Sequence, residues 1–389
     1  MRTTDRSRLG SRLQMAQGWY WAFGVNGDPY ARLLCGQDDT PARWYEQIRA
    51  ASPGPFRSRT GAWVVTGYAA AAQVLDGTGF TPAAGEAAED WARPFPDVRT
   101  AAGPEPAPLD QLVEEYRALL PDRGTRFDLA RDLAHEVPAR GVTARLGLTG
   151  EDARRCAALL RTGAVAVDAR LTPQSLAVTE ETLAALEALR AQAGADGALS
   201  AAACEAAANT VCHAVLAVLH TPGLAARLAV EADLAERIVA ETLRTAPPVH
   251  LESRRATEGR TFHGAELAEG DEVVVAVGAA HRDPEVFAAP DRFDVDRTGE
   301  PPALTASRGH QGGPQGGPQG GHQGGHQGGH QGGPQGGHQG GVAEFAARHA
   351  VAALRALAGV LPGTALAGPV VHRRRSPVLR SISRCPVEI

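Results

Sequence analysis

Apolar residues recur at three- and four-residue spacing through the middle of the chain, a pattern that predicts consecutive amphipathic and buried helices. A first short helix is expected after Thr40 and Pro41, which offer an N-cap and a first-turn proline. The same spacing then predicts helices over 110–120, 126–147, 150–167, 173–192, 199–220 and 231–244, with a last one over 342–359. The middle of the chain is therefore expected to be helical.

Short runs of β-branched and apolar residues flank this helical part. Residues 62–66 read AWVVT and predict a strand, and the alanine-rich run 68–75 predicts a helix directly after it. Further strands are expected over 249–256, 260–263 and 271–279. Many helices with small β sections at both ends predict a mostly α fold with small β sections.

A four-residue repeat occupies residues 310–341. Each of its eight units is His or Pro followed by Gln-Gly-Gly, and the paired glycines make an ordered backbone entropically expensive. We predict a low-complexity flexible loop within a single domain that spans 1–389. Its five histidines offer adventitious nickel or zinc binding, but a tolerated surface loop explains the repeat without any ligand.

Charge and cysteine content exclude several classes of protein. The 39 Lys+Arg and 44 Asp+Glu residues give a net charge of −5, which provides no electrostatic reason to expect nucleic acid. The five cysteines form no CxxC pair, which is typical of a reducing compartment without a disulfide framework or zinc ribbon. The first 13 residues lack an apolar signal core, and three polar residues interrupt the most apolar stretch, 201–219. We expect a cytoplasmic protein with no membrane segment.

A recognisable series of motifs begins on the helix that ends near residue 244. Glu241 and Arg244 have Glu-x-x-Arg spacing, which places both side chains on one helical face within pairing distance. Arg254, the strand 271–279, the sequence HRDP (281–284) and the sequence PDRF (290–293) follow in order. This series resembles the C-terminal half of a bacterial cytochrome P-450. The resemblance implies a cytochrome P-450 fold in which Glu241, Arg244 and Arg292 form a buried, structural charge lock.

One residue of this series departs from the family pattern. His281 occupies a position where the family usually has Asn. We expect it to serve as a turn or capping residue and not as a catalytic group.

The residues that a cytochrome P-450 needs for its chemistry are missing. No cysteine lies between Cys212 and Cys385, so the thiolate that would bind haem iron is absent and the repeat fills the expected interval. On the central helix the resemblance implies an acid followed by Thr, but alanines follow Glu205. The resemblance also implies a His and an Arg on an early helix that hold a haem propionate, but no histidine precedes residue 135. Arg254 alone remains as a plausible propionate partner, and it could equally be a surface residue. We expect no haem, no metal and no catalytic residue.

Three segments without generic catalytic meaning point to a subgroup. Residues 9–39, 168–180 and 373–389 are similar to haem-cysteine-less, cytochrome P-450-like auxiliary proteins that activate macrolide deoxysugar (desosaminyl-type) glycosyltransferases in erythromycin-type pathways. The resemblance implies a non-enzymatic partner of a TDP-deoxysugar-dependent transferase, acting in a hetero-oligomer. The candidate interface is an aromatic cluster, whose alternative explanation is ordinary packing of an N-terminal helix: Trp19, Tyr20, Trp21 and Phe23.

Two other functions remain open at this point. One is a haem monooxygenase that uses a non-cysteine ligand such as a repeat histidine, and a Soret band would identify it. The other is a protein that binds a small molecule, such as a macrolide, in the vacated cavity. The run Arg373–Arg375 either meets an acidic partner or is solvated surface charge.

Overall fold

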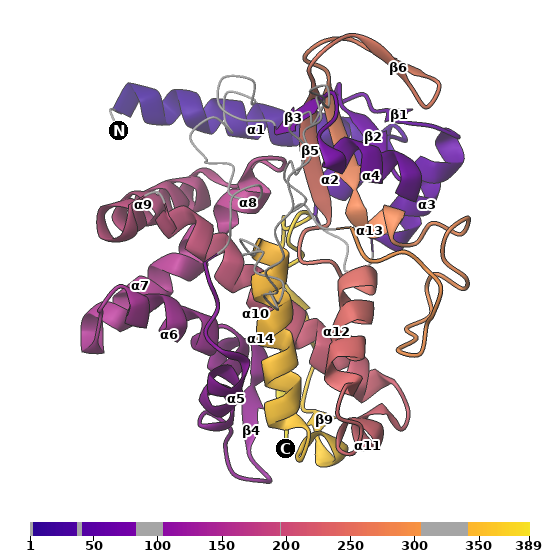
Figure 1. Ribbon diagram of the computed structural model, residues 1–389. Helices are drawn as coiled ribbons and strands as arrows, with labels where there is room; N and C mark the ends of the chain where they lie inside the picture. The colour runs from indigo at the N-terminus through magenta and orange to yellow at the C-terminus, as the bar shows by residue number, and fades with distance from the viewer. Residues whose placement is uncertain (1–2, 37–40, 83–103, 195, 305–340) are drawn as a thin grey trace, which may run out of the picture.

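A computed structural model of the chain describes residues 3–36, 41–82, 104–194, 196–304 and 341–389. Helices fill the lower and left parts of the molecule in Figure 1, and the largest sheet lies at the upper right. The first helix, α1 (Thr3–Val25), runs across the top of the helical part. The repeat falls outside the described residues up to residue 340, so the flexible loop stays a prediction.

The centre of the helical part is α10 (Asp196–His220), which packs along α14 (Val342–Leu357). By length and composition α10 is apolar enough to cross a membrane, but 83% of its most apolar window is buried inside the protein. Helices that are apolar on all sides belong in such a core. The other helices are α2 (Pro29–Leu34), α3 (Ala42–Ala51), α4 (Tyr68–Asp76), α5 (Leu109–Arg117), α6 (Glu136–Arg145), α7 (Gly150–Gly163), α8 (Val165–Ala169), α9 (Leu176–Ala193), α11 (Leu224–Leu228), α12 (Leu234–Thr245) and α13 (Val277–Ala280).

The largest sheet has the order β1-β2-β8-β5-β3. Its strands are β1 (Phe56–Arg57), β2 (Trp63–Val65), β3 (Phe80–Pro82), β5 (Leu251–Ala256) and β8 (Glu272–Ala276). β2 and β8 are parallel, with Val64 opposite Val274, and the other pairs are antiparallel. These central valines are fully buried, which is typical of parallel strands covered on both faces. The mostly α fold with small β sections is thus confirmed.

Three smaller sheets complete the described fold. One has the order β4-β12-β9, and the others are the pairs β10-β11 and β6-β7. Their strands are β4 (Arg126–Asp128), β6 (Arg260–Phe262), β7 (Ala265–Leu267), β9 (Ala365–Leu366), β10 (Val371–His372), β11 (Ile382–Arg384) and β12 (Pro386–Glu388).

The single helix predicted over 126–147 is wrong. Strand β4 is followed by the π-helix η2 (Leu129–Ala134), and only then by α6. Asp128 is the N-cap of η2, because its carboxylate accepts hydrogen bonds from the N–H groups of Ala130 and Arg131. β4 also pairs with β12 at the far end of the chain, with Phe127 opposite Val387. Because the partner strand lies about 260 residues away, the local spacing of apolar residues could not predict strand β4.

Candidate functional site

The buried ion pair of the predicted lock is present. Arg244 Nη2 donates to Glu241 Oε1 at 2.7 Å, and both side chains are at most 5% exposed. The same guanidinium donates to the backbone carbonyls of His281, Pro290 and Arg292. Arg244 of α12 therefore binds the backbone at residue 281 and at residues 290–292, both of which follow strand β8.

The prediction that Arg292 is the third member of the lock is wrong. The Arg292 side chain is 72% exposed and lies 3.8 Å from Asp294, away from Glu241. The turn at 290–292 presents its carbonyl oxygens to Arg244, so the Arg292 side chain points outward. Arg297 takes its place, with Nε 3.5 Å from Glu241 Oε1 and a side chain only 13% exposed. The lock is therefore Glu241, Arg244 and Arg297.

His281 is a structural residue, as expected. Its Nδ1 donates to the Arg244 carbonyl at 3.1 Å, and its Nε2 accepts the Leu304 N–H at 2.6 Å. Burial lowers the pKa of His281 to about 3, so the ring is neutral. A neutral imidazole with one donor and one acceptor satisfies both backbone groups.

The space between α10 and α14 is filled by side chains. Phe345 and its neighbours on α14 pack directly against small residues of α10 in one buried cluster: Ala203, Ala206, Ala207, Val342, Phe345 and Ala346. The two helices are therefore in direct side-chain contact along this stretch.

Glu205, the expected acid of the central helix, is engaged inside the protein. Its carboxylate lies 3.6 Å from Arg373 Nη1 and 3.7 Å from His135 Nδ1, and the side chain is 4% exposed. Burial alone would raise the pKa of this carboxyl, but His135, Arg373 and a hydrogen bond from Ser381 outweigh it, so the pKa is lowered. Glu205 is thus a fixed anion held by Arg373.

Other groups that would serve a haem are also occupied. Arg254 is buried and donates to Glu252 Oε2 at 3.1 Å. Cys385 is buried, and so are Cys156, Cys204 and Cys212. Within the described residues, no group of three or more His, Cys, Asp and Glu side chains is placed to hold a metal. Among the described residues, Arg254, the predicted propionate partner, is therefore already paired with Glu252.

The three segments that carry the subgroup resemblance meet in space, which their sequence positions do not reveal. Asp168, at the end of α8, is fully buried and accepts Nη2–H of Arg373 at 2.7 Å and the Ser376 hydroxyl at 2.7 Å. It also accepts the backbone N–H groups of Val378 and Leu379. One carboxylate therefore organises the C-terminal segment, and Arg373 is a partly buried ion-pair partner of Asp168 and not solvated surface charge.

The N-terminal segment joins the same junction. Gln17 of α1 donates to the carbonyls of Pro173 and Gln174, and the Arg375 N–H donates to the Gly36 carbonyl at 2.9 Å. Gly36 has a φ of +57°, and a Cβ there would lie 2.7 Å from the Arg375 Cα. Only glycine allows this approach. We call this meeting of residues 9–36, 168–180 and 373–389 the three-segment junction.

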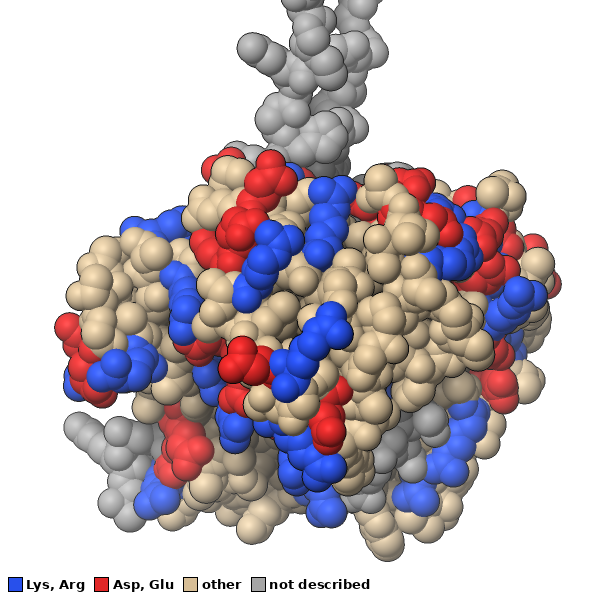
Figure 2. Space-filling model, turned by 90° about the horizontal axis from the view of Figure 1, so that it is seen from below, with Lys and Arg blue, Asp and Glu red and all other residues tan. Residues whose placement is uncertain are grey.

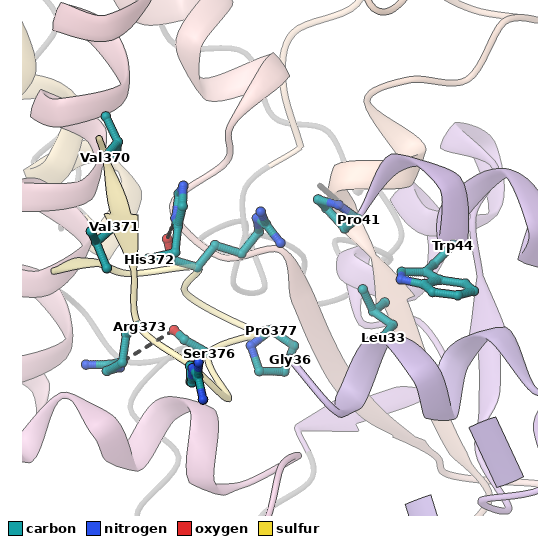
Figure 3. Close-up of a pocket in the computed structure, with 12 residues that line it drawn as sticks. Leu33, Gly36, Pro41, Trp44, Val370, Val371, His372, Arg373, Ser376 and Pro377 are labelled. Carbon is teal, nitrogen blue, oxygen red and sulfur yellow. Dashed lines mark hydrogen bonds between the residues drawn. The ribbon is translucent and has the colours of Figure 1, made fainter. Parts of the chain in front are cut away.

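A cavity of about 310 Å³ lies on one side of the junction. Figure 3 shows Leu33, Pro41 and Trp44 on one wall, with His372, Arg373 and Ser376 of the C-terminal hairpin on the other. The rest of the lining is Gly36, Val370, Val371, Arg374, Pro377 and Arg380. The sequence gives no sign of this cavity because its two walls come from segments more than 300 positions apart.

On the other side of the junction, α1 covers a second hollow and exposes an apolar face. Tyr20 and Trp21 help to line a groove of about 320 Å³, and Cys35 and Arg375 are also part of its lining. Trp19 and Trp21 are 55% and 58% exposed, and Trp19 stacks on Phe23 with ring centroids 5.7 Å apart. Leu13 and Tyr20 face the body instead. Of the predicted aromatic cluster, Trp19 and Trp21 thus face solvent, whereas Tyr20 packs inward.

Charges of both signs are mixed on the face of the molecule that looks down in Figure 1. Figure 2 shows arginines and acidic residues interspersed there, without a large area of one sign. This face offers no broad electrostatic footprint for a polyanion.

The fold and the buried Glu241–Arg244 pair define a protein of the cytochrome P-450 class. Solved structures agree on the fold. The structure of Mycobacterium smegmatis CYP164A2 with econazole bound has a TM-score of 0.67 at 23% identity, covering 93% of this chain and 99% of that one. A cytochrome P-450 in complex with an acyl carrier protein that carries hexadec-9Z-enoic acid has a TM-score of 0.69 at 20% identity, covering 90% and 98%.

The sequence comparisons place the chain more closely. The Cytochrome P-450 family model matches residues 197–300. The chain is 46% identical, over all of both chains, to the cytochrome P-450 family protein EryCII of Saccharopolyspora erythraea. It is 33% identical to the protein AknT of Streptomyces galilaeus over 98% of this chain and 96% of that one. It is also 33% identical to the protein DesVIII of Streptomyces venezuelae over 100% and 95%. The chain belongs to the cytochrome P-450 family.

Proposed function

We propose that this chain is a non-catalytic, haem-free partner that binds, stabilises and activates a TDP-deoxysugar-dependent macrolide glycosyltransferase in antibiotic biosynthesis, in the cytoplasm. The observation that carries the proposal is the three-segment junction. The segments that resemble the glycosyltransferase auxiliary proteins converge on one region, which supports a common role for them. In this proposal the chain acts through its fold and its binding surface and not through a catalytic site.

Activation by such a partner needs only a difference in affinity. A protein that binds the active form of a transferase about 100-fold more tightly than its inactive form shifts that equilibrium by about 2.7 kcal/mol. No side chain of the activator has to touch the sugar donor or the macrolide. The absence of a catalytic residue is therefore compatible with a large effect on turnover.

The exposed face of α1 is the surface we assign to the transferase. Exposed tryptophans at the centre of a patch are typical of binding hot spots. The exposed apolar side chains of α1 are Met15, Trp19, Trp21 and Val25, each more than half exposed. They cover two flanks of the helix, with Trp19 stacked on Phe23 on one flank and Trp21 on the other. The groove beneath Trp21 adds a concave surface next to this convex one.

The test is co-expression with the transferase of the same pathway. We expect the two proteins to co-purify, and we expect transferase turnover and solubility to fall when this chain is omitted. A transferase that is equally soluble and equally active alone would refute the proposal. Adding the purified chain to transferase that is already folded separates activation from folding assistance, because only activation restores turnover at that stage.

A further inference from the structure

Helix α1 contains three glycines, and two of them lie where the helix meets the body of the protein. A Cβ at Gly10 would lie 3.2 Å from Leu176 Cδ2, and a Cβ at Gly24 would lie 3.3 Å from the backbone of Arg32. A glycine in a helix interior is less favourable than an alanine. Close packing against the body therefore accounts for Gly10 and Gly24.

The third glycine, Gly18, has no such neighbour. It is exposed, and a Cβ there would meet no atom of a described residue within 4 Å. No contact within the described part of the chain therefore requires a glycine in the middle of α1. A neighbour that approaches α1 closely would require one, because the distance between two packed helices depends on the side chains between them.

Gly18 lies on the flank of α1 that borders the groove. Four residues at four-, three- and four-residue spacing follow this side of the helix: Gln14, Gly18, Trp21 and Val25. The first three of them also line the groove of about 320 Å³. We call these four residues the glycine flank. Gly18 is thus a low point in a row of side chains beside a concave surface.

The glycine flank belongs to an uncharged part of α1. Residues 13–25 contain no Asp, Glu, Lys or Arg, and all the charged residues of the helix precede them. Trp21 and Val25 are 58% and 54% exposed. Exposed apolar side chains without charges are typical of the centre of a protein–protein interface, where charged residues are depleted. A complementary partner surface is therefore apolar and uncharged as well.

The form of the flank also restricts the secondary structure of the partner. The backbone N–H and C=O groups of this stretch are bonded within α1, so the flank offers no free edge to a β-strand. Side chains at i, i+4, i+7 and i+11 form a ridge, which is the surface that a second helix packs against. From Gln14 to Val25 the ridge is about 17 Å long, or about three helical turns.

We propose that an α-helix of the glycosyltransferase packs along the glycine flank, crosses α1 at Gly18 and places an apolar side chain in the groove. The identity of the partner rests on the proposed function. The flank adds the element that the partner uses and the point of closest contact.

Two substitutions of Gly18 test this contact, with transferase binding measured by calorimetric titration and stability by urea unfolding. G18A and G18L should both raise the urea midpoint of the free chain, because they replace a helix-interior glycine whose described surroundings are open. G18L should weaken transferase binding by about tenfold or more, because its side chain holds the partner helix away. G18A adds one methyl group and should weaken binding by less.

The matched control is G141L on α6, where a Cβ also meets no atom of a described residue within 4 Å. Helix α6 lies away from α1 (Figure 1). G141L should therefore raise the urea midpoint in the same way and bind the transferase like wild type.

The possible outcomes separate this contact from the proposed function. A wild-type chain that does not bind the transferase contradicts the proposed function and the contact together. Equal affinity of G18L and wild type overturns the contact alone. A lowered urea midpoint of G18L would show that a segment of the same chain covers Gly18. A wild-type chain that sediments as a dimer, with a monomeric G18L, would show that a second copy does. Each of these two results overturns the assignment to the transferase.

Discussion

Arg297 Nε lies 3.5 Å from Glu241 Oε1, in the position that the sequence pattern predicted for Arg292. Arg297 also donates to Glu300 at 2.9 Å and to the carbonyl of Arg292 at 3.1 Å. Glu241 in turn accepts from Arg244 and from the Asp294 N–H. The loop 288–300 is therefore closed on α12 by two arginines around one buried carboxylate.

The lock predicts a clear order among substitutions. E241A should lower the free energy of unfolding by about 3–5 kcal/mol, because it leaves buried Arg244 without its counter-ion. R297A should lower it by about 1–3 kcal/mol, whereas exposed R292A should change it by less than about 0.5 kcal/mol. Urea unfolding of the three variants measures the order. An R292A chain as unstable as R297A would restore the original assignment.

Phe345 tests the closure of α14 on α10. F345A should lower the free energy of unfolding by about 3–5 kcal/mol, because the ring is 4% exposed and its removal leaves a cavity between the helices. We also expect wild-type protein to show no Soret band after incubation with haemin. A tolerated F345A together with stoichiometric haem uptake would show that the helices separate to admit the cofactor.

Buried neutral histidines predict sensitivity to acid. Burial lowers the pKa of His281, His213 and His349 to about 3, whereas an unfolded histidine titrates near 6.5. The unfolded chain therefore binds more protons between these pH values. Stability is fully present above about pH 6.5 and is lost as the pH falls toward 3, by up to about 1.4 kcal/mol per pH unit for each histidine.

The variant H281Q isolates one of these groups. The difference in urea midpoint between pH 7 and pH 5 should be smaller in H281Q than in wild type, whatever the variant's stability at pH 7. If the two chains lose the same stability over this range, His281 is not buried in its neutral form.

If α1 binds the glycosyltransferase, substitutions of its exposed tryptophans should weaken the complex without unfolding the chain. W19A/W21A should weaken the complex with the glycosyltransferase by about 2 kcal/mol or more, or roughly 30-fold, and should leave the free energy of unfolding nearly unchanged because both rings face solvent. The control is V230A, since Val230 is 83% exposed on a different part of the chain.

Cys35 gives an independent readout of the same surface. It is partly exposed beside the groove, and the other four cysteines are buried. The transferase should slow alkylation of Cys35 in the wild-type complex. Unchanged alkylation together with full affinity of W19A/W21A would move the interface elsewhere.

Local patterns predicted the helices well, because three- and four-residue spacing reports which face of a helix is buried. They failed where the partner is distant. β4 depends on β12, and Arg297 replaces Arg292 because a turn of three residues decides which side chain points inward. Asp168 lies in a segment that the sequence singled out, but its role follows only from hydrogen bonds across more than 200 residues. The cavity had no sequence signal for the same reason.

The most direct test of the central claim is the turnover of purified, folded glycosyltransferase titrated with this chain. We predict saturable stimulation that W19A/W21A reduces and V230A does not, with haem-free protein throughout. Equal turnover with and without the chain, or stimulation that requires added haem, would contradict the account.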